Sequence, residues 1–356
     1  MRQVLLIALS LIAAIASAAG GDRYSAVTPD RVLVFPRDHG SHPAFRTEWW
    51  YATGWLQTDA GEQLGFQITF FRARTQADEA NPSAFTPQQL IIAHGAISDP
   101  RRGRLWKDQR IARAVLGLAG ADETDTRVWL DRWQLARSAQ GYSARIDAEE
   151  FGFDLALQPT QPVLLNGRAG FSQKGPQPRS ASYYYSQPHL RVTGSVTREG
   201  QVASVTGTAW LDHEWSSEIL DAEAIGWDWI GINLDDGGAL MAFRLRDAAG
   251  RQHWAAGTLR SADGRTQTFE PEQIEFTPGR RWRSPRTGYV YPVEWRLQAG
   301  ALAITLQPMM DDQEADSRMS TGAVYWEGAV TALVDGKPIG RGYLELTGYG
   351  ERLRLP

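Results

Sequence analysis

The sequence contains no cysteine among its 356 residues. This absence excludes disulfide bonds, thiolate nucleophiles, iron–sulfur clusters, zinc sites built on cysteine and a lipid anchor on an N-terminal cysteine. Lysine is scarce too: Lys107, Lys174 and Lys337 are the only lysines among 37 basic residues. The formal net charge is -4 and no segment forms a basic stripe, so the sequence argues against nucleic acid as a partner.

Long hydrophobic stretches are missing after the first twenty residues. Within those twenty, Arg2 precedes an apolar run of 13 residues, Val4–Ala16, and Ala16-Ser17-Ala18 matches a cleavage site. The run is shorter than the roughly 20 residues of a spanning helix. Residues 1–18 are therefore predicted to be a cleaved signal peptide. We expect a periplasmic or secreted protein without stable membrane insertion.

Helical periodicity is nearly absent beyond residue 22, and apolar residues alternate instead, as in Leu64–Phe70, Leu302–Leu306 and Tyr343–Leu346. This period of two is typical of half-buried strands. Turn signals such as Asp235-Asp236-Gly237-Gly238 separate the strands and indicate β-hairpins. The predicted class is antiparallel all-β, as a meander, barrel or sandwich.

The two halves of the chain resemble each other in four segments, and the order of the segments is kept. Trp50–Arg72 corresponds to Trp227–Arg246, and Ile92–Gly95 to Trp254–Gly257. Leu155–Pro159 then corresponds to Ile304–Pro308, and Val205–Trp210 to Gly340–Glu345. The offsets shrink from about 176 to 162, 149 and 135. A tandem duplication follows, with predicted domains at residues 22–215 and 216–356.

Common catalytic signatures are missing: the sequence has no G-x-S-x-G elbow, P-loop, G-x-G-x-x-G after a strand, or H-E-x-x-H. The densest polar cluster is Trp210–Ser217, in which Asp212, His213 and Glu214 lie between two tryptophans. On a strand, Asp212 and Glu214 share one face and His213 lies on the other. Burial in an apolar cavity would raise a carboxyl pKa and prepare it for acid–base chemistry. Alternatively, these groups only cap turns and make satisfied hydrogen bonds.

Two further acidic groups stand among aromatic residues. Glu48, in Thr47-Glu48-Trp49-Trp50-Tyr51, either takes part in a site or pairs with an arginine inside the fold. Asp228, between Trp227 and Trp229, could protonate an alkene while the indole faces stabilise the cation. Alternatively, Asp228 is a surface residue of a packed strand.

Candidate ligand-binding residues are the aromatic and polar side chains around these acids: Glu48, Trp50, His94, Tyr185, Trp215, Trp227, Trp229 and Trp326. Each of them could equally be packing in a strand or a satisfied core residue. His39 and His42 with Asp38 lack an evident further partner, so no metal site is predicted.

Five strings together resemble the AttH-like family, whose members are also described as predicted secreted hydrolases or carotenoid 1,2-hydratase (hydroxyneurosporene synthase) homologues. The resemblance covers most of residues 35–350. It is carried by His42–Gly54, Ala93–Asp99, Trp210–Ser216, Gly226–Trp229 and Glu327–Tyr349.

The resemblance implies a pair of lipocalin-like (calycin) β-barrel domains with a pocket between them. It also implies a hydratase that adds water to a C=C bond of an isoprenoid- or lipid-like molecule without a cofactor. Under this hypothesis Asp228 or Asp212 protonates the alkene, and His213 positions or deprotonates water. Trp215, Trp227 and Trp229 would stabilise the cation.

Two other functions remain open at the sequence level. One is a non-catalytic periplasmic carrier that holds a hydrophobic small molecule or lipid. The other is an accessory protein of an envelope transporter, which would dock through aromatic surface. The sequence alone does not decide whether the chain is an enzyme.

Overall fold

The computed structural model describes residues 23–77, 80–81, 83 and 85–353. Within these ranges the chain forms 25 β-strands and two short 3-10 helices, η1 (Arg37–His39) and η2 (Pro271–Gln273), but no α-helix. The predicted all-β class is confirmed. The predicted signal peptide, residues 1–18, lies outside the described residues. Nowhere in the described part of the chain is a helix long and apolar enough to cross a membrane.

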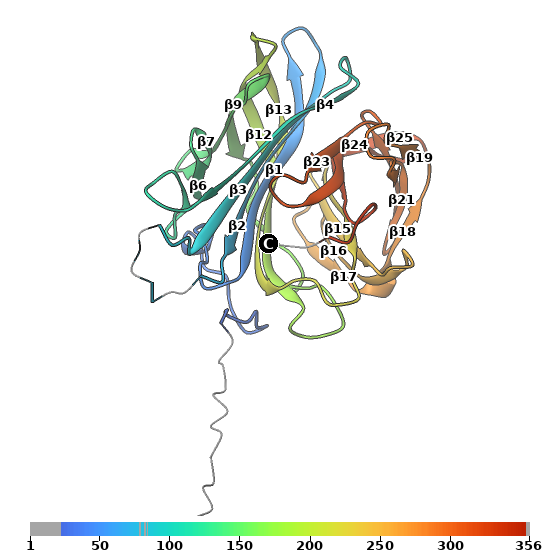
Figure 1. Cartoon of the computed structure of the whole chain (residues 1–356). Helices are drawn as coiled ribbons and strands as arrows, with labels where there is room; N and C mark the ends of the chain where they lie inside the picture. Colours follow the sequence, from blue (N-terminus) through green and yellow to red (C-terminus); the bar gives the residue numbers. More distant parts are fainter. Residues whose placement is uncertain (1–22, 78–79, 82, 84, 354–356) are drawn as a thin grey trace, which may run out of the picture.

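The first sheet contains β1 (Thr47–Thr58), β2 (Gln63–Arg74), β3 (Gln89–Asp99), β4 (Arg104–Arg113), β5 (Ala119–Ala121), β6 (Arg127–Leu130), β7 (Trp133–Ser138), β8 (Gly141–Asp147), β9 (Phe151–Pro159), β10 (Leu164–Leu165), β11 (Phe171–Gln173), β12 (Ala181–Arg198) and β13 (Gln201–Glu218). The spatial order is β4-β3-β2-β1-β13-β12-β9-β8-β7-β6-β5, with β10 and β11 paired to β12. Strands β3 and β4 contact β5 and β6 at the opposite end of this order. The sheet therefore curls into a barrel, drawn in blue to green in Figure 1.

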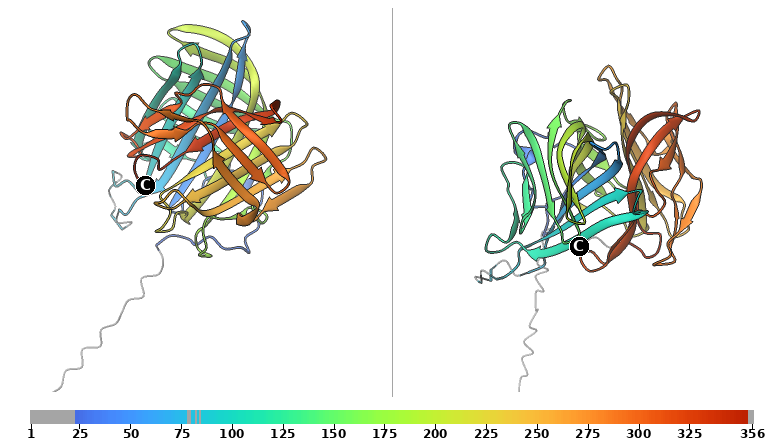
Figure 2. Two further views of the ribbon diagram at one scale, coloured as in Figure 1. Left: turned by 90° about the vertical axis from the view of Figure 1, so that its right-hand side faces the viewer. Right: turned by 90° about the horizontal axis from the view of Figure 1, so that it is seen from above.

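The second sheet contains β14 (Gly226–Leu234), β15 (Ala239–Arg246), β16 (Gln252–Arg260), β17 (Thr266–Phe269), β18 (Ile274–Pro278), β21 (Trp295–Ala299), β22 (Leu302–Pro308), β23 (Glu314–Ser317), β24 (Ala323–Val334) and β25 (Lys337–Leu346). The order is β17-β16-β15-β14-β25-β24-β22-β21-β18, and β18 also contacts β15 and β16. A small separate sheet pairs β19 (Arg281–Arg283) with β20 (Val290–Pro292). The result is a second barrel beside the first (Figure 2).

The two barrels share one strand order. In the first, β3-β2-β1-β13-β12-β9 run side by side, and β16-β15-β14-β25-β24-β22 do so in the second. All four segment pairs that were matched in the sequence occupy corresponding places, and the predicted tandem architecture is confirmed. The chain leaves the first sheet at Glu218 and enters the second at Gly226, so the predicted boundary at residues 215/216 falls within β13.

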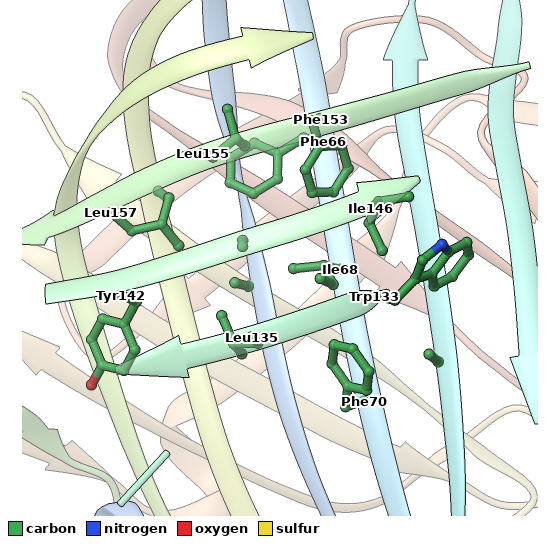
Figure 3. Close-up of a cluster of buried hydrophobic side chains, with 14 of the residues drawn as sticks. Phe66, Ile68, Phe70, Trp133, Leu135, Tyr142, Ile146, Phe153, Leu155 and Leu157 are labelled. Atoms are coloured by element: carbon green, nitrogen blue, oxygen red, sulfur yellow. The ribbon is translucent and has the colours of Figure 1, made fainter. Parts of the chain in front are cut away.

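Side chains fill the interior of each barrel. Figure 3 shows part of the first interior, where Phe66, Ile68 and Trp133 meet residues of β8 and β9. The second interior is packed around Trp295 and Trp326. These side chains form apolar cores of the kind that drives folding by removing hydrocarbon surface from water. Each barrel also encloses a group of ion pairs, centred on Glu48 in the first and on Asp228 in the second.

A third apolar cluster joins the barrels to each other. It includes Tyr51, Trp55 and Trp210 from the first barrel and Trp229, Met241 and Tyr343 from the second. The Trp55 indole N–H donates to the Gly342 carbonyl at 3.1 Å. A Cβ atom on Gly65 would lie 2.5 Å from the Tyr343 hydroxyl, so a larger residue there would force the barrels apart. The outer faces of β1, β2, β13, β14 and β15 are thus turned toward one another.

Candidate functional site between the barrels

A cavity of about 100 Å³ lies between the barrels, enclosed by the outward faces of strands from both. Its apolar walls are Trp49, Phe71, Trp227, Trp229, Phe243 and Leu245. Its polar groups are Tyr51, His94, Lys174, Asp212, Glu214, Tyr325, Glu327 and Glu345. An apolar cavity with a few converging polar groups is the usual form of a small-molecule site.

Strand alternation decides which side chains reach the cavity. Successive residues of a strand point to opposite faces of the sheet. On β1, Trp49 and Tyr51 therefore face the cavity, whereas Trp50 belongs to the first barrel's interior. On β24, Glu327 faces the cavity and Trp326 the second barrel's interior.

Two carboxyl groups meet on the second barrel's side of the cavity. Glu327 of β24 and Glu345 of β25 are directly opposite each other in the sheet. Burial and the neighbouring Glu345 raise the pKa of Glu327 well above its usual range, and burial raises the pKa of Glu345 to about 7. Both acids therefore retain protons at a pH where ordinary carboxyl groups are ionised.

Glu327 also lacks a partner for one of its oxygens. Its Oε1 and the hydroxyl of Tyr51 are both buried and make no hydrogen bond of normal geometry in the described structure, although the two groups are close enough for the Tyr51 hydroxyl to lower the pKa of Glu327. Glu345, in contrast, accepts a hydrogen bond from the Trp227 indole N–H at 3.0 Å. Buried polar atoms are nearly always hydrogen-bonded, so two unpartnered groups in one cavity indicate a place where a ligand or water completes the set.

Asp212 is held on the first barrel's side. Its carboxyl group accepts hydrogen bonds from Tyr184 at 2.7 Å, Ser186 at 2.6 Å and the Trp210 indole at 2.7 Å. Burial raises the pKa of Asp212 to about 7 despite these three donors. Tyr184 in turn accepts from the Trp229 indole N–H at 3.0 Å, which links Asp212 to the second barrel.

Glu214 forms an ion pair with Lys174, whose Nζ lies 2.8 Å from Oε1. Lys174 is buried, and burial lowers the pKa of its ammonium group although Glu214 opposes the effect. The ammonium group also lies 3.9 Å from the centroid of the Phe243 ring. The cavity thus already holds one cation between a carboxylate and an aromatic face.

His94 lies at the cavity with both ring nitrogens engaged. Nδ1 is 2.8 Å from the Tyr325 hydroxyl, and Nε2 is 2.9 Å from Ser320 Oγ. Burial and the positive charge of Lys107 lower the pKa of His94 to about 3. The ring is therefore neutral near pH 7 and brings no charge to the cavity.

A family model described as AttH-like matches residues 26–349. The chain belongs to the AttH-like family. Among solved structures, that of an AttH homologue from Nitrosomonas europaea is 54% identical to this chain, with a TM-score of 0.86. The match covers 91% of this chain and 99% of that one. No protein among the curated ones matches the chain.

Two more distant structures share the architecture of this AttH-like chain. Kievitone hydratase from Nectria haematococca is 16% identical with a TM-score of 0.69, and the match covers 92% of this chain and 96% of that one. CghA, solved with Sch210972, is 14% identical with a TM-score of 0.55, over 93% and 97% of the two chains. At such identities the likeness concerns the fold alone.

Of the residues that the sequence predicts for the site, the cavity brings together Asp212, Glu214, His94, Trp227 and Trp229. The remaining predicted residues lie elsewhere: His213, Asp228, Glu48, Trp50, Tyr185, Trp215 and Trp326. The structure also adds Tyr51, Lys174, Glu327 and Glu345, which were absent from the predicted site. Of these, Tyr51 and Glu327 directly follow the predicted residues Trp50 and Trp326 in the sequence, so alternation places them on the opposite face of each strand, and that opposite face is the one that meets the cavity.

His213 belongs to an ionic network inside the first barrel. Its Nε2–H donates to Glu48 Oε1 at 2.7 Å, and Nδ1 lies 3.1 Å from the Tyr185 hydroxyl. Glu48 also accepts from Arg72 Nε and from His42 Nδ1, each at 2.8 Å. The prediction that His213 acts on water in the pocket is therefore wrong. His213 and Asp212 point to opposite faces of β13, and only the face that carries Asp212 meets the cavity.

The other predicted aromatic residues of the first barrel surround this network. The His213 ring stacks on Trp50 at a centroid distance of 4.7 Å, and the His42 ring stacks on Trp215 at 3.7 Å. His42, Glu48 and His213 offer three potential metal-ligand atoms within 4.8 Å of one another. Each of these atoms is already hydrogen-bonded, and Arg72 supplies the countercharge, so the cluster fits an ionic network better than a metal centre.

The prediction that Asp228 protonates a ligand in the pocket is also wrong. Asp228 lies inside the second barrel, where Arg244 Nε donates to it at 2.7 Å and the Tyr349 hydroxyl at 2.9 Å. Arg246 Nε is also within 3.2 Å. Trp227 and Trp229 point outward to the cavity, so alternation on β14 directs Asp228 away from it. Asp228 cannot reach a ligand held by those tryptophans.

We expect Glu48→Gln to destabilise the protein by about 3–5 kcal/mol, because the change leaves the buried Arg72 without its countercharge. The free energy of unfolding in urea, followed by tryptophan fluorescence, measures the effect. Glu275→Gln, at an exposed position of β18, is the matched control and should stay within about 0.5 kcal/mol of the parent. A loss below about 1 kcal/mol for Glu48→Gln would show that the network is not needed for stability.

The raised pKa of Glu345 has a consequence for stability. Between about pH 4.5 and 7 the folded chain keeps a proton that the unfolded chain has lost, so Glu345 lowers stability as the pH rises through this interval. Glutamine carries no such proton. We therefore expect the free energy of unfolding of Glu345→Gln, measured in urea, to increase relative to that of the parent when the pH is raised from 5 to 8. A difference that is independent of pH would contradict the assignment.

Proposed function

We propose that the chain binds an apolar small molecule between its barrels and hydrates a C=C bond of that molecule, with Glu327 as the acid. The observation that carries this proposal is a buried carboxylic acid with an unpartnered oxygen, facing an aromatic-walled cavity. Kievitone hydratase, a hydratase by name, has the same fold, and hydration is therefore the reaction class that we put forward for this cavity.

The chemistry needs an acid that is still protonated near neutral pH. Glu327 fulfils this condition because burial and Glu345 raise its pKa. The Glu327 proton passes to one alkene carbon while the π electrons form the new C–H bond, which leaves a cation on the other carbon. Water then adds to that cation, and one of its protons returns to the Glu327 carboxylate. The product is an alcohol and the acid is regenerated.

The cavity provides two ways of stabilising the cation. Trp227 and Trp229 present aromatic rings, whose faces attract positive charge. The carboxylate that Glu327 becomes after proton transfer, together with Glu214, supplies negative charge nearby. Tyr51, whose hydroxyl lies beside Glu327 and makes no hydrogen bond of normal geometry among the described residues, would hold the attacking water. These roles replace those first expected of Asp228 and His213.

Oxygen-18 labelling tests the reaction. Small phenols that carry a trisubstituted isopentenyl side chain are incubated with the protein in H2(18)O, and the mass of the product is measured. We expect a gain of one labelled water per molecule with the parent chain, a loss of at least about 100-fold in rate for Glu327→Gln, and no change for Glu275→Gln. Glutamine keeps the shape, but its amide N–H protons are far too weakly acidic to protonate an alkene.

Two results would contradict the hydratase. If Glu327→Gln hydrates the alkene as fast as the parent, another group is the acid. If the parent retains the phenols without adding label, the cavity serves a carrier and the raised pKa values have no catalytic use.

We also propose that the protein is exported, from Arg2, the apolar run Val4–Ala16 and the Ala16-Ser17-Ala18 string. Expression of the full chain in a Gram-negative host, followed by fractionation and intact mass measurement, tests this. The expected result is periplasmic protein that begins at Ala19. Full-length protein in the cytoplasm would rule the proposal out.

A further inference from the structure

The cavity carries an excess of acidic groups. Four carboxyl groups line it, those of Asp212, Glu214, Glu327 and Glu345, against one basic side chain, Lys174. That single cation is already paired with Glu214 at 2.8 Å. No cation compensates the other three carboxyl groups, and burial therefore raises their pKa values and favours their protonated forms. A bound cation would stabilise one of them as a carboxylate and release its proton, whereas an anionic ligand would bring a further buried negative charge.

One carboxyl oxygen in the cavity, Oε1 of Glu327, can still accept a hydrogen bond. Glu327 is 5% exposed, and its Oε1 has no hydrogen-bond partner among the described residues. Leaving such a group unpaired costs free energy that a bound N–H donor would recover. A charged N–H group would recover more than a neutral one, because hydrogen bonds between ionised groups are about twice as strong.

The same cavity already shows how it accommodates an ammonium group. The Nζ of Lys174 lies 3.9 Å from the Phe243 ring centroid and 4.8 Å from the Tyr184 ring centroid, beside the Glu214 carboxylate. Carboxyl group, aromatic face and exclusion of water recur around Glu327, where Trp227 and Trp229 also line the wall. Aromatic walls with a nearby carboxylate are the usual means of recognising alkylammonium ions.

We propose that the cavity binds apolar amines in their ammonium form, with the N–H group donating to Glu327 and the alkyl chain lying against the tryptophans. This inference rests on the proposed function in one respect, that the ligand occupies the same cavity. The inference does not require that the protein catalyses hydration. An ammonium ion has the charge of the cation formed on alkene protonation, so such an amine should also inhibit hydration.

Calorimetric titration at pH 7 with three probes of equal chain length tests the preference: N,N-dimethyloctylamine, octan-1-ol and octanoate. We expect the amine to bind at least tenfold more tightly than octan-1-ol, and octanoate to bind most weakly. Glu327→Gln should weaken amine binding about tenfold and leave octan-1-ol within twofold of the parent. Glu275→Gln should change neither.

The proposal is overturned if octanoate binds as tightly as the amine or more tightly, or if the amine does not bind at all. It is also overturned if Glu327→Gln still prefers the amine to octan-1-ol as strongly as the parent does. If Glu327→Gln fails to fold, Glu345→Gln and the ranking of the probes on the parent chain still decide. Amine preference without incorporation of label would remove only the hydratase. Incorporation of label without amine preference would remove only this inference.

Discussion

The placement of the first barrel's cavity residues on β1 and β13 depends on one buried carboxylate, that of Glu48. It accepts hydrogen bonds from Arg72 on β2, His213 on β13 and His42 in the segment before β1. Burial alone would raise the pKa of Glu48, but Arg72 and His42 outweigh burial and hold it well below its usual range. A slip of β1 by one residue would turn Glu48 to the opposite face and break every one of these bonds. The register that these bonds fix is the one that turns Tyr51 and Asp212 toward the second barrel.

Buried carboxyl groups are treated in two different ways in this chain. Glu48 and Asp228 lie inside the barrels beside arginine side chains, in the manner of structural ion pairs. Glu327 and Glu345 lie between the barrels without an arginine partner, and their pKa values are raised instead. In the first arrangement the ionised carboxylate holds neighbouring strands together through its ion pairs. In the second the carboxyl group keeps a proton that it can transfer. This contrast, rather than the aromatic character of the surrounding sequence, separates structural acids from chemically useful ones.

Much of the fold could be predicted from the sequence because alternation and turn signals are local. The same holds for the duplication, whose four segment pairs appear at corresponding places in the two sheets. The match of Trp50 with Trp227 is right at the level of strands, yet one side chain lies inside its barrel and the other outside. The site could be predicted only in part. The predicted alternation on β13, with Asp212 and Glu214 on one face and His213 on the other, agrees with the structure. Which face meets the other barrel depends on how the barrels pack. Lys174 reaches the cavity from the connection between β11 and β12, a contact that no sequence spacing indicates.

The cavity exists because the barrel interiors are full. With Trp133 packed in one core and Trp295 in the other, a ligand cannot occupy a barrel interior without unfolding part of it. The faces turned toward each other remain, and each barrel contributes only part of the polar set: Asp212 comes from the first, Glu327 from the second. Either barrel alone would expose its acids to water, where their pKa values would return toward ordinary ones and the protons would be lost at neutral pH. The pairing of barrels thus supplies the desolvation on which the chemistry depends, and this gives a physical reason why two copies remain joined in one chain.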